Sequence, residues 1–269
     1  MPALPLMLLS LFVEPEANFS AGIRTEQGWL SHAVTSPYQM GETEIRVLAP
    51  EVIEGQTCPV NYVLPVEAGR ESRYGDGLTE ILKLPAEMRQ RAIYVAPTFS
   101  QLPWYADHPT DPRIRQESHF LKAVLPFVER TYPARRDRGG RLLLGFSKSG
   151  WGAWSLLLRH PDRFERAAAW DAPLMMSAPG KYGSSPIFGD PATFSGYQIS
   201  TLLRDRVESL RPHARLIHLG YGNFRSDHVQ VESLLEELKI PHTYHDGPQR
   251  EHIWHTGWIA EGVELLLRP

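Results

Sequence analysis

The chain has 269 residues, of which 42% are hydrophobic, and a formal net charge of −3 at pH 7. This length allows one large α/β domain or two small ones, and the weak negative charge excludes a basic surface field of the kind that binds nucleic acid. Cys58 is the single cysteine, so an internal disulfide framework and a zinc site built on thiolates are also excluded.

The first 35 residues are predicted to form an N-terminal arm or a signal segment ahead of a domain over residues 36–269. Residues 3–13 are apolar, but this stretch is too short to span a bilayer as a helix. It is similar to a signal-peptide core, although no Lys or Arg precedes it and no clear cleavage site follows it. We therefore expect a cytoplasmic protein with no membrane span, and export is the open alternative.

Short apolar runs then alternate with stretches of helical periodicity. The predicted strands are residues 44–50, 59–66, 92–97, 141–146, 166–172, 215–221 and 242–245. The predicted helices are residues 78–91, 117–132, a stretch after Ser147, 197–211, 227–239 and 256–268. No linker interrupts this alternation, which indicates one domain with a mostly parallel sheet and helices on both faces.

A serine lies between the apolar run 141–146 and the helix that follows, in the motif GFSKS at residues 145–149. A serine hydroxyl needs a base to remove its proton and donors to hold the oxyanion that forms. A sharp strand-to-helix turn projects the hydroxyl at the carboxyl edge of the sheet and directs the amino end of the helix toward that charge. Gly145 and Ser149 are small enough for the turn, although the second position is usually glycine. Ser147 is the predicted nucleophile.

The base in such an architecture follows the last strand, and several histidines lie in that part of the chain. His252 stands just before the C-terminal helix and is the predicted base, with His255 as the second candidate. The remaining two, His242 and His245, precede or occupy the last short strand and are expected to be structural. Their spacing is not that of an H-E-x-x-H zinc helix, so we expect no metal site.

Five segments carry a resemblance to a known family: "PVNYVLPV", "IYVAPTFSQLPWYAD", "ESHFLKAVLPFVERTYP", "GFSKSGWGAWSLLLRHPDRF" and "REHIWHTGW". By the order of these segments over residues 42–268, the chain resembles the Putative esterase family of α/β-hydrolases. That family includes S-formylglutathione hydrolases of the esterase D type, feruloyl and acetylxylan esterases, siderophore esterases and mycolyltransferases. The resemblance implies an α/β-hydrolase fold and a serine hydrolase that cleaves carboxylic esters through an acyl-enzyme.

The acid of the implied catalytic triad is the least certain member. The family takes it from a Gly-x-x-Asp pattern after the penultimate strand, where this chain has Asn223. Asp227, four residues later, is the first candidate, and its alternative role is to cap the next helix. Asp171, at the end of the strand after the nucleophile helix, is the second candidate, and its alternative role is to cap a turn. An asparagine can orient a histidine but cannot balance the charge of an imidazolium.

The remaining site residues are predicted from their positions along the chain relative to the catalytic segments. The backbone amides of Lys148, which follows the nucleophile, and of Glu67 are the expected oxyanion donors. Aromatic side chains that flank the catalytic segments either wall a substrate pocket or pack in the core. These residues are Trp104, Tyr105, Trp151 and Trp254.

The expected activity is therefore hydrolysis of a small-molecule or carbohydrate-linked carboxylic ester, with no cofactor. An acyltransferase or a thioesterase would use the same residues, because loop shape decides the acyl acceptor. A non-catalytic carbohydrate-binding relative of the fold is the alternative from another class, motivated by Asn223 and Ser149. The oligomeric state is left open.

Overall fold

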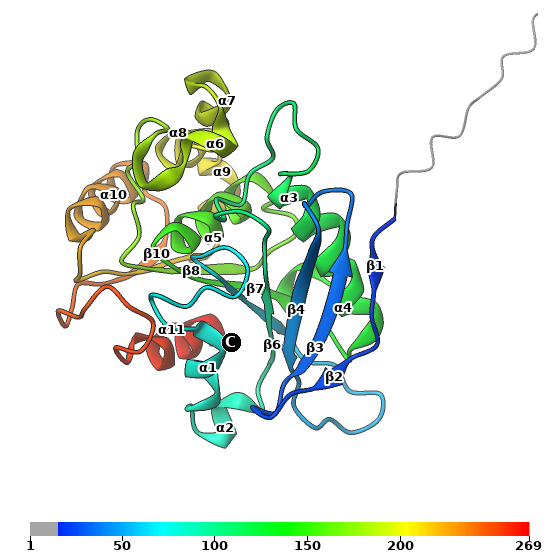
Figure 1. The fold of residues 1–269 in the computed structure, drawn as a ribbon. Helices are drawn as coiled ribbons and strands as arrows, with labels where there is room; N and C mark the ends of the chain where they lie inside the picture. Colours follow the sequence, from blue (N-terminus) through cyan, green and yellow to red (C-terminus); the bar gives the residue numbers. More distant parts are fainter. Residues whose placement is uncertain (1–15, 269) are drawn as a thin grey trace, which may run out of the picture.

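The structure is a computed structural model that describes residues 16–268. Its strands are β1 (Asn18–Phe19), β2 (Ile23–Arg24), β3 (Leu30–Thr35), β4 (Glu42–Leu48), β5 (Val60–Leu64), β6 (Ile93–Pro97), β7 (Arg141–Phe146), β8 (Arg166–Trp170), β9 (Leu216–Leu219) and β10 (His242–His245). They form one sheet in the order β1-β3-β4-β6-β5-β7-β8-β9-β10, with β2 paired to β3 (Figure 1). Strands β5 to β10 pair in parallel, whereas β1 to β4 are antiparallel, including β4 against β6. The expected mostly parallel α/β sheet is confirmed.

Helices cover both faces of this sheet. They are α1 (Gly77–Leu82), α2 (Ala86–Arg89), α3 (Gln116–His119), α4 (Leu125–Thr131), α5 (Lys148–Arg159), α6 (Ser185–Phe188), α7 (Pro191–Ser195), α8 (Ile199–Asp205), α9 (Val207–Leu210), α10 (Arg225–Leu238) and α11 (Trp258–Leu266). Helices α1 and α11 pack in one core, and α4, α5, α8 and α10 pack in the core on the other face. Figure 1 shows α5 and α11 on opposite sides of the sheet.

Strand β7 lies between these two cores. Leu143 faces the core that contains α5, and its neighbours Leu142 and Leu144 face the core that contains α11. All three side chains are buried. Burial on both faces explains why this strand reads as a continuous apolar run rather than an alternating one.

Part of the predicted N-terminal arm belongs to the sheet. Strand β3 pairs with β4 from Leu30, opposite Val47, to Thr35, opposite Glu42, and Val34 is fully buried between them. The boundary placed at residue 35 therefore cuts through a sheet that begins at β1. The apolar stretch 3–13 lies outside the described residues. Across residues 16–268, no helix combines the length and the apolar character needed to cross a membrane.

Several predicted helices are shorter or broken. The stretch 78–91 divides into α1 and α2 because Pro85 lies between them as the N-cap of α2. The stretch 197–211 divides into α8 and α9 at Arg206, whose φ of −109° is not helical. The segment after β8 forms a 3₁₀ turn, η3 (Lys181–Gly183), and helices α6 and α7 before α8 begins.

Candidate active site

Two polar side chains stand next to each other at the carboxyl ends of adjacent parallel strands. Phe146 of β7 is paired with Trp170 of β8, so the residues that follow them, Ser147 and Asp171, leave the sheet side by side. The Ser147 amide donates to the Trp170 carbonyl at 3.0 Å, and the Asp171 amide donates to the Leu219 carbonyl at 3.0 Å. This register brings a hydroxyl and a carboxylate to one edge of the sheet.

The turn after β7 is sharp and strained. Ser147 has φ 54° and ψ −125°, which side-chain-bearing residues rarely adopt. Gly145 is required here because a Cβ on it would lie 2.1 Å from the carbonyl oxygen of Ser149. The Ser149 hydroxyl accepts the Phe146 N–H at 3.0 Å and donates to the Phe146 carbonyl at 2.9 Å. Serine thus fits where glycine is usual, and its hydroxyl ties the helix start to the strand end.

His252 lies between the hydroxyl and the carboxylate. Its Nε2 is 3.0 Å from Oγ of Ser147, and its Nδ1 is 2.5 Å from Oδ2 of Asp171. The ring packs against Phe146, with ring centroids 4.5 Å apart. The loop from β10 to α11 that carries His252 is held by the Trp254 amide, which donates to the Tyr74 carbonyl at 2.8 Å. His255, the second candidate for the base, lies on the same loop with its side chain exposed.

The Asp171 carboxylate is fully buried and has three partners. Besides His252, it accepts the Asn223 amide at 2.9 Å and the Phe224 amide at 2.6 Å. Gly222 allows this approach, since a Cβ on it would lie 2.2 Å from Oδ2 of Asp171. A buried carboxylate needs such partners, because a buried polar group without a hydrogen bond costs free energy.

Of the two candidate acids, Asp171 contacts His252, whereas Asp227 has other partners. Oδ2 of Asp227 accepts the Met175 amide at 2.9 Å, and Asp227 lies in the first turn of α10. The N-cap of that helix is Phe224, so Asp227 is not the cap either. The sequence did carry a signal for Asp171: it follows its strand as Ser147 follows the neighbouring one.

The two expected oxyanion donors lie in the turns after β5 and β7. Lys148 is the first residue of α5, so its amide has no acceptor within the helix. The turn that contains Glu67 is held where the Tyr105 hydroxyl donates to the Pro65 carbonyl at 2.6 Å. The Glu67 carboxylate accepts the Tyr74 amide at 3.3 Å. Burial lowers the pKa of the Lys148 ammonium, and the nearby Glu67 carboxylate opposes this effect.

Three of the four aromatic residues expected in the substrate pocket are core residues. Trp104, Tyr105 and Trp151, the last of which belongs to α5, have no exposed surface because they pack in the core on the α5 side of the sheet. The core is so closely packed at Gly152 that a Cβ on this residue would lie 2.1 Å from the ring of Tyr105. These three side chains therefore offer no surface to a substrate in this structure.

Trp254, the fourth of these residues, lines a cavity of about 450 Å³ beside β3, β4 and α1. Glu67 also lines this cavity, but Ser147 and His252 do not.

Other aromatic side chains, which were not predicted from the sequence, border the candidate site. The centroids of the Tyr74 and Phe224 rings lie 5.7 and 5.5 Å from that of His252, and both residues are half-buried. Tyr182, with 48% of its surface exposed, packs edge-on against Phe224 at 5.3 Å. Tyr74 and Phe224 come from loops and Tyr182 comes from η3, so only the folded structure brings these three side chains together.

Residues 36–190, more than half of the chain, match the sequence profile of the family described as Putative esterase. The chain belongs to this family. It is a carboxylic ester hydrolase, as expected from its motifs. No curated protein sequence matches this esterase.

Solved structures with the same fold resemble this esterase. An S-formylglutathione hydrolase (FrmB) from Staphylococcus aureus has 16% identity and a TM-score of 0.69, covering 90% of this chain and 99% of its own. The Agrobacterium tumefaciens S-formylglutathione hydrolase has 16% identity and a TM-score of 0.68, covering 93% and 98%. A ferulic acid esterase has 19% identity and a TM-score of 0.69, covering 89% and 96%. These likenesses confirm the α/β-hydrolase fold.

Proposed function

We propose that the esterase cleaves its substrate through an acyl-enzyme on Ser147, with His252 as the base and Asp171 as the acid of the triad. The observation that carries this proposal is the unbroken row of hydrogen bonds from the Ser147 hydroxyl through His252 to the buried Asp171 carboxylate. A nucleophile bonded to a base, and a base oriented by a third group, is the arrangement that activates serine.

In the first half of the reaction, Oγ of Ser147 attacks the ester carbonyl and Nε2 of His252 takes the hydroxyl proton. The amides of Lys148 and Glu67 donate to the oxyanion of the tetrahedral intermediate. As the intermediate collapses, His252 returns the proton to the departing alcohol and Ser147 is left acylated. Asp171 stabilises the imidazolium throughout.

In the second half, His252 removes a proton from water, which attacks the acyl carbonyl. Collapse of this intermediate releases the carboxylic acid, and the proton returns to Ser147. Apart from the ester and one water molecule, the groups named in these steps are side chains and amides of this chain. Tyr74 and Phe224, beside His252, are the aromatic surfaces that we expect the substrate to contact.

Labelling with a fluorophosphonate tests the nucleophile. We expect one modified residue, Ser147, in the wild-type protein and no labelling of Ser147→Ala. Ser149→Ala is the matched control, because Ser149 lies two residues away with a buried hydroxyl and should not affect the site of modification. An unlabelled wild-type protein would favour the non-catalytic binding alternative instead.

A further inference from the structure

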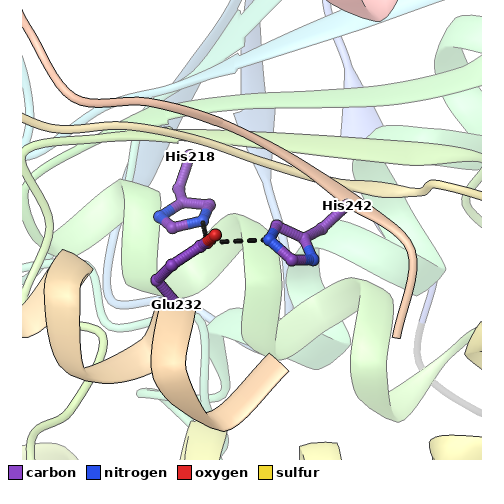
Figure 2. A group of neighbouring side chains, drawn as sticks. All are labelled: His218, Glu232 and His242. Carbon is purple, nitrogen blue, oxygen red and sulfur yellow. Dashed lines mark hydrogen bonds and ion pairs between the residues drawn. The ribbon is translucent and has the colours of Figure 1, made fainter. Parts of the chain in front are cut away.

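A row of hydrogen-bonded side chains begins directly behind the acid of the proposed triad. The Ala172 amide donates to Nε2 of His228 at 2.9 Å, and Nδ1 of His228 lies 3.3 Å from Nδ1 of His218. Nε2 of His218 lies 3.0 Å from Oε2 of Glu232, which Nε2 of His242 also contacts at 2.7 Å (Figure 2). Both His218 and His228 are completely buried.

The position of each proton follows from these partners. The Ala172 N–H can only donate, so Nε2 of His228 is an acceptor and the ring proton lies on Nδ1. That proton is donated to Nδ1 of His218, which leaves the proton of His218 on Nε2, directed at the Glu232 carboxylate. Burial lowers the pKa of both rings, in agreement with their being neutral. From the Ala172 amide to Glu232 the row is a relay in which every bond has one donor and one acceptor.

The outer end of this row also has the composition of a metal site. Ligand atoms of His218, Glu232 and His242 lie within 4.8 Å of one another (Figure 2). A histidine that binds metal must present a lone pair to the ion. Nε2 of His218 carries a proton instead, and moving it to Nδ1 would set two N–H groups of His218 and His228 against each other. The relay is therefore favoured over a metal centre.

The end of the row nearest to the triad, the His228 ring, contacts a strained part of the backbone. Asp171 has φ 39°, a conformation that costs a residue with a side chain about 1–3 kcal/mol and persists only where neighbours enforce it. The Asp171 amide donates to the Leu219 carbonyl, and the next amide, that of Ala172, donates to Nε2 of His228. Gly220 leaves room for this ring, since a Cβ on it would lie 2.5 Å from Cγ of His228.

We propose that His228 is a positioning residue of the triad: its ring fixes the Ala172 amide and thereby keeps the Asp171 carboxylate aligned with His252. The inference rests on the proposed function, because it gives His228 a role in the alignment of that triad. His218 and Glu232 contribute by fixing the tautomer that lets His228 accept the amide proton. His228 itself contacts neither Ser147 nor His252, so its effect passes through Asp171.

Kinetics on two variants test this role, with turnover of a p-nitrophenyl ester divided by the amount of serine that a fluorophosphonate titrates. His228→Leu removes the acceptor, and we expect kcat per titrated serine to fall about 10-fold or more with little change in KM, because small misplacements of catalytic groups are costly. His228→Gln places an amide oxygen near the Nε2 position and should restore most of the turnover. His213→Leu, in an exposed loop, is the matched control and should leave kcat unchanged.

Equal turnover per titrated serine in His228→Leu and the wild type would overturn the proposal, as would equal losses in the Leu and Gln variants. A role in stability alone would lower the melting temperature and the amount of titratable serine but not the turnover of each serine. If the wild type itself neither hydrolyses the ester nor takes the label, the proposed function fails, and that result is distinct from either outcome.

The tautomers can be measured in the wild-type protein even if His228→Leu does not fold. Long-range ¹H–¹⁵N correlation of the histidine rings should report the proton on Nδ1 of His228 and on Nε2 of His218. Addition of equimolar Zn²⁺ should leave both signals unchanged. A proton on Nε2 of His228, or loss of the His218 proton on addition of Zn²⁺, would contradict the relay and favour a metal site.

Discussion

At the scale of single residues, the carboxylate that contacts His252 belongs to Asp171 and not, as the resemblance implies, to a residue after the penultimate strand. The expected aspartate after the penultimate strand is replaced by Asn223, whose backbone amide instead donates to Asp171. The carboxylate comes from the end of β8, one strand closer to the nucleophile. A glycine at residue 222 leaves room for the Asp171 carboxylate, because a Cβ there would clash with it.

Replacement of Asp171 separates the two candidate acids. Asp171→Asn should lower kcat about 10³- to 10⁴-fold, because the amide cannot stabilise the imidazolium and can favour the wrong tautomer of His252. Asp227→Asn is the matched control and should stay near wild type, since an asparagine oxygen can still accept the Met175 amide. Steady-state hydrolysis of a p-nitrophenyl ester measures both variants, and a larger loss in Asp227→Asn would reverse the assignment.

The sequence points to Ser147 and His252 by their place relative to an apolar strand and the last helix, and the structure joins them by a hydrogen bond. Which of the two candidate aspartates contacts His252 could not be predicted in the same way. It depends on the register of β7 against β8 and on the course of the loop after β9, and neither has a local sequence signal. For the same reason, the sequence left open whether Trp104 and Trp151 wall a pocket or pack in the core, because an aromatic near a motif in sequence can face either way.

At the scale of elements, the junction of β7 and α5 depends on a contact that the family's glycine cannot make. Ser149→Gly removes both hydrogen bonds of the hydroxyl to Phe146 and adds backbone freedom at the start of the helix. We expect the free energy of unfolding to fall by about 1–2 kcal/mol. Urea denaturation of the two proteins at neutral pH measures this difference, and an unchanged midpoint would show that the hydroxyl contributes nothing to stability.

At the scale of the whole molecule, ion pairs join segments that are distant in the chain. Glu117 of α3 contacts Arg159 of α5 and His160 just after it, and only 13% of its side chain is exposed. Burial opposes the charge, but these partners lower the pKa of Glu117 to about 2 from an ordinary value of 4.5. The stabilisation from this carboxylate is therefore complete above pH 4.5 and is lost as the pH falls toward 2.

This linkage predicts a pH-dependent difference between two variants. Glu117→Gln should lower the free energy of unfolding at pH 7 by up to about 3 kcal/mol, and the difference from wild type should shrink between pH 4.5 and 2. Glu208→Gln is the matched control, because Glu208 pairs with Arg211 on the surface with 85% of its side chain exposed. Urea titrations at several pH values measure these energies. A constant difference at every pH would show that the charge of Glu117 is not responsible.

Much of the overall architecture can be predicted from the sequence, because strands that are buried on both faces of the sheet are recognisable as continuous apolar segments. The edge strands cannot be recognised in this way. Strands β1 and β2 have two residues each, and β3 mixes polar and apolar residues because only part of it is buried. Their membership of the sheet depends on pairing with β4, which local sequence does not encode.

Pre-steady-state hydrolysis of p-nitrophenyl acetate tests whether Ser147 is an activated nucleophile. We predict a burst of nitrophenol near one equivalent of enzyme, if deacylation is the slower step, and a loss of kcat of about 10³-fold or more in both Ser147→Ala and His252→Ala. Turnover in Ser147→Ala equal to that of the wild type would contradict the account, because hydrolysis would then proceed without the serine on which the proposed mechanism depends.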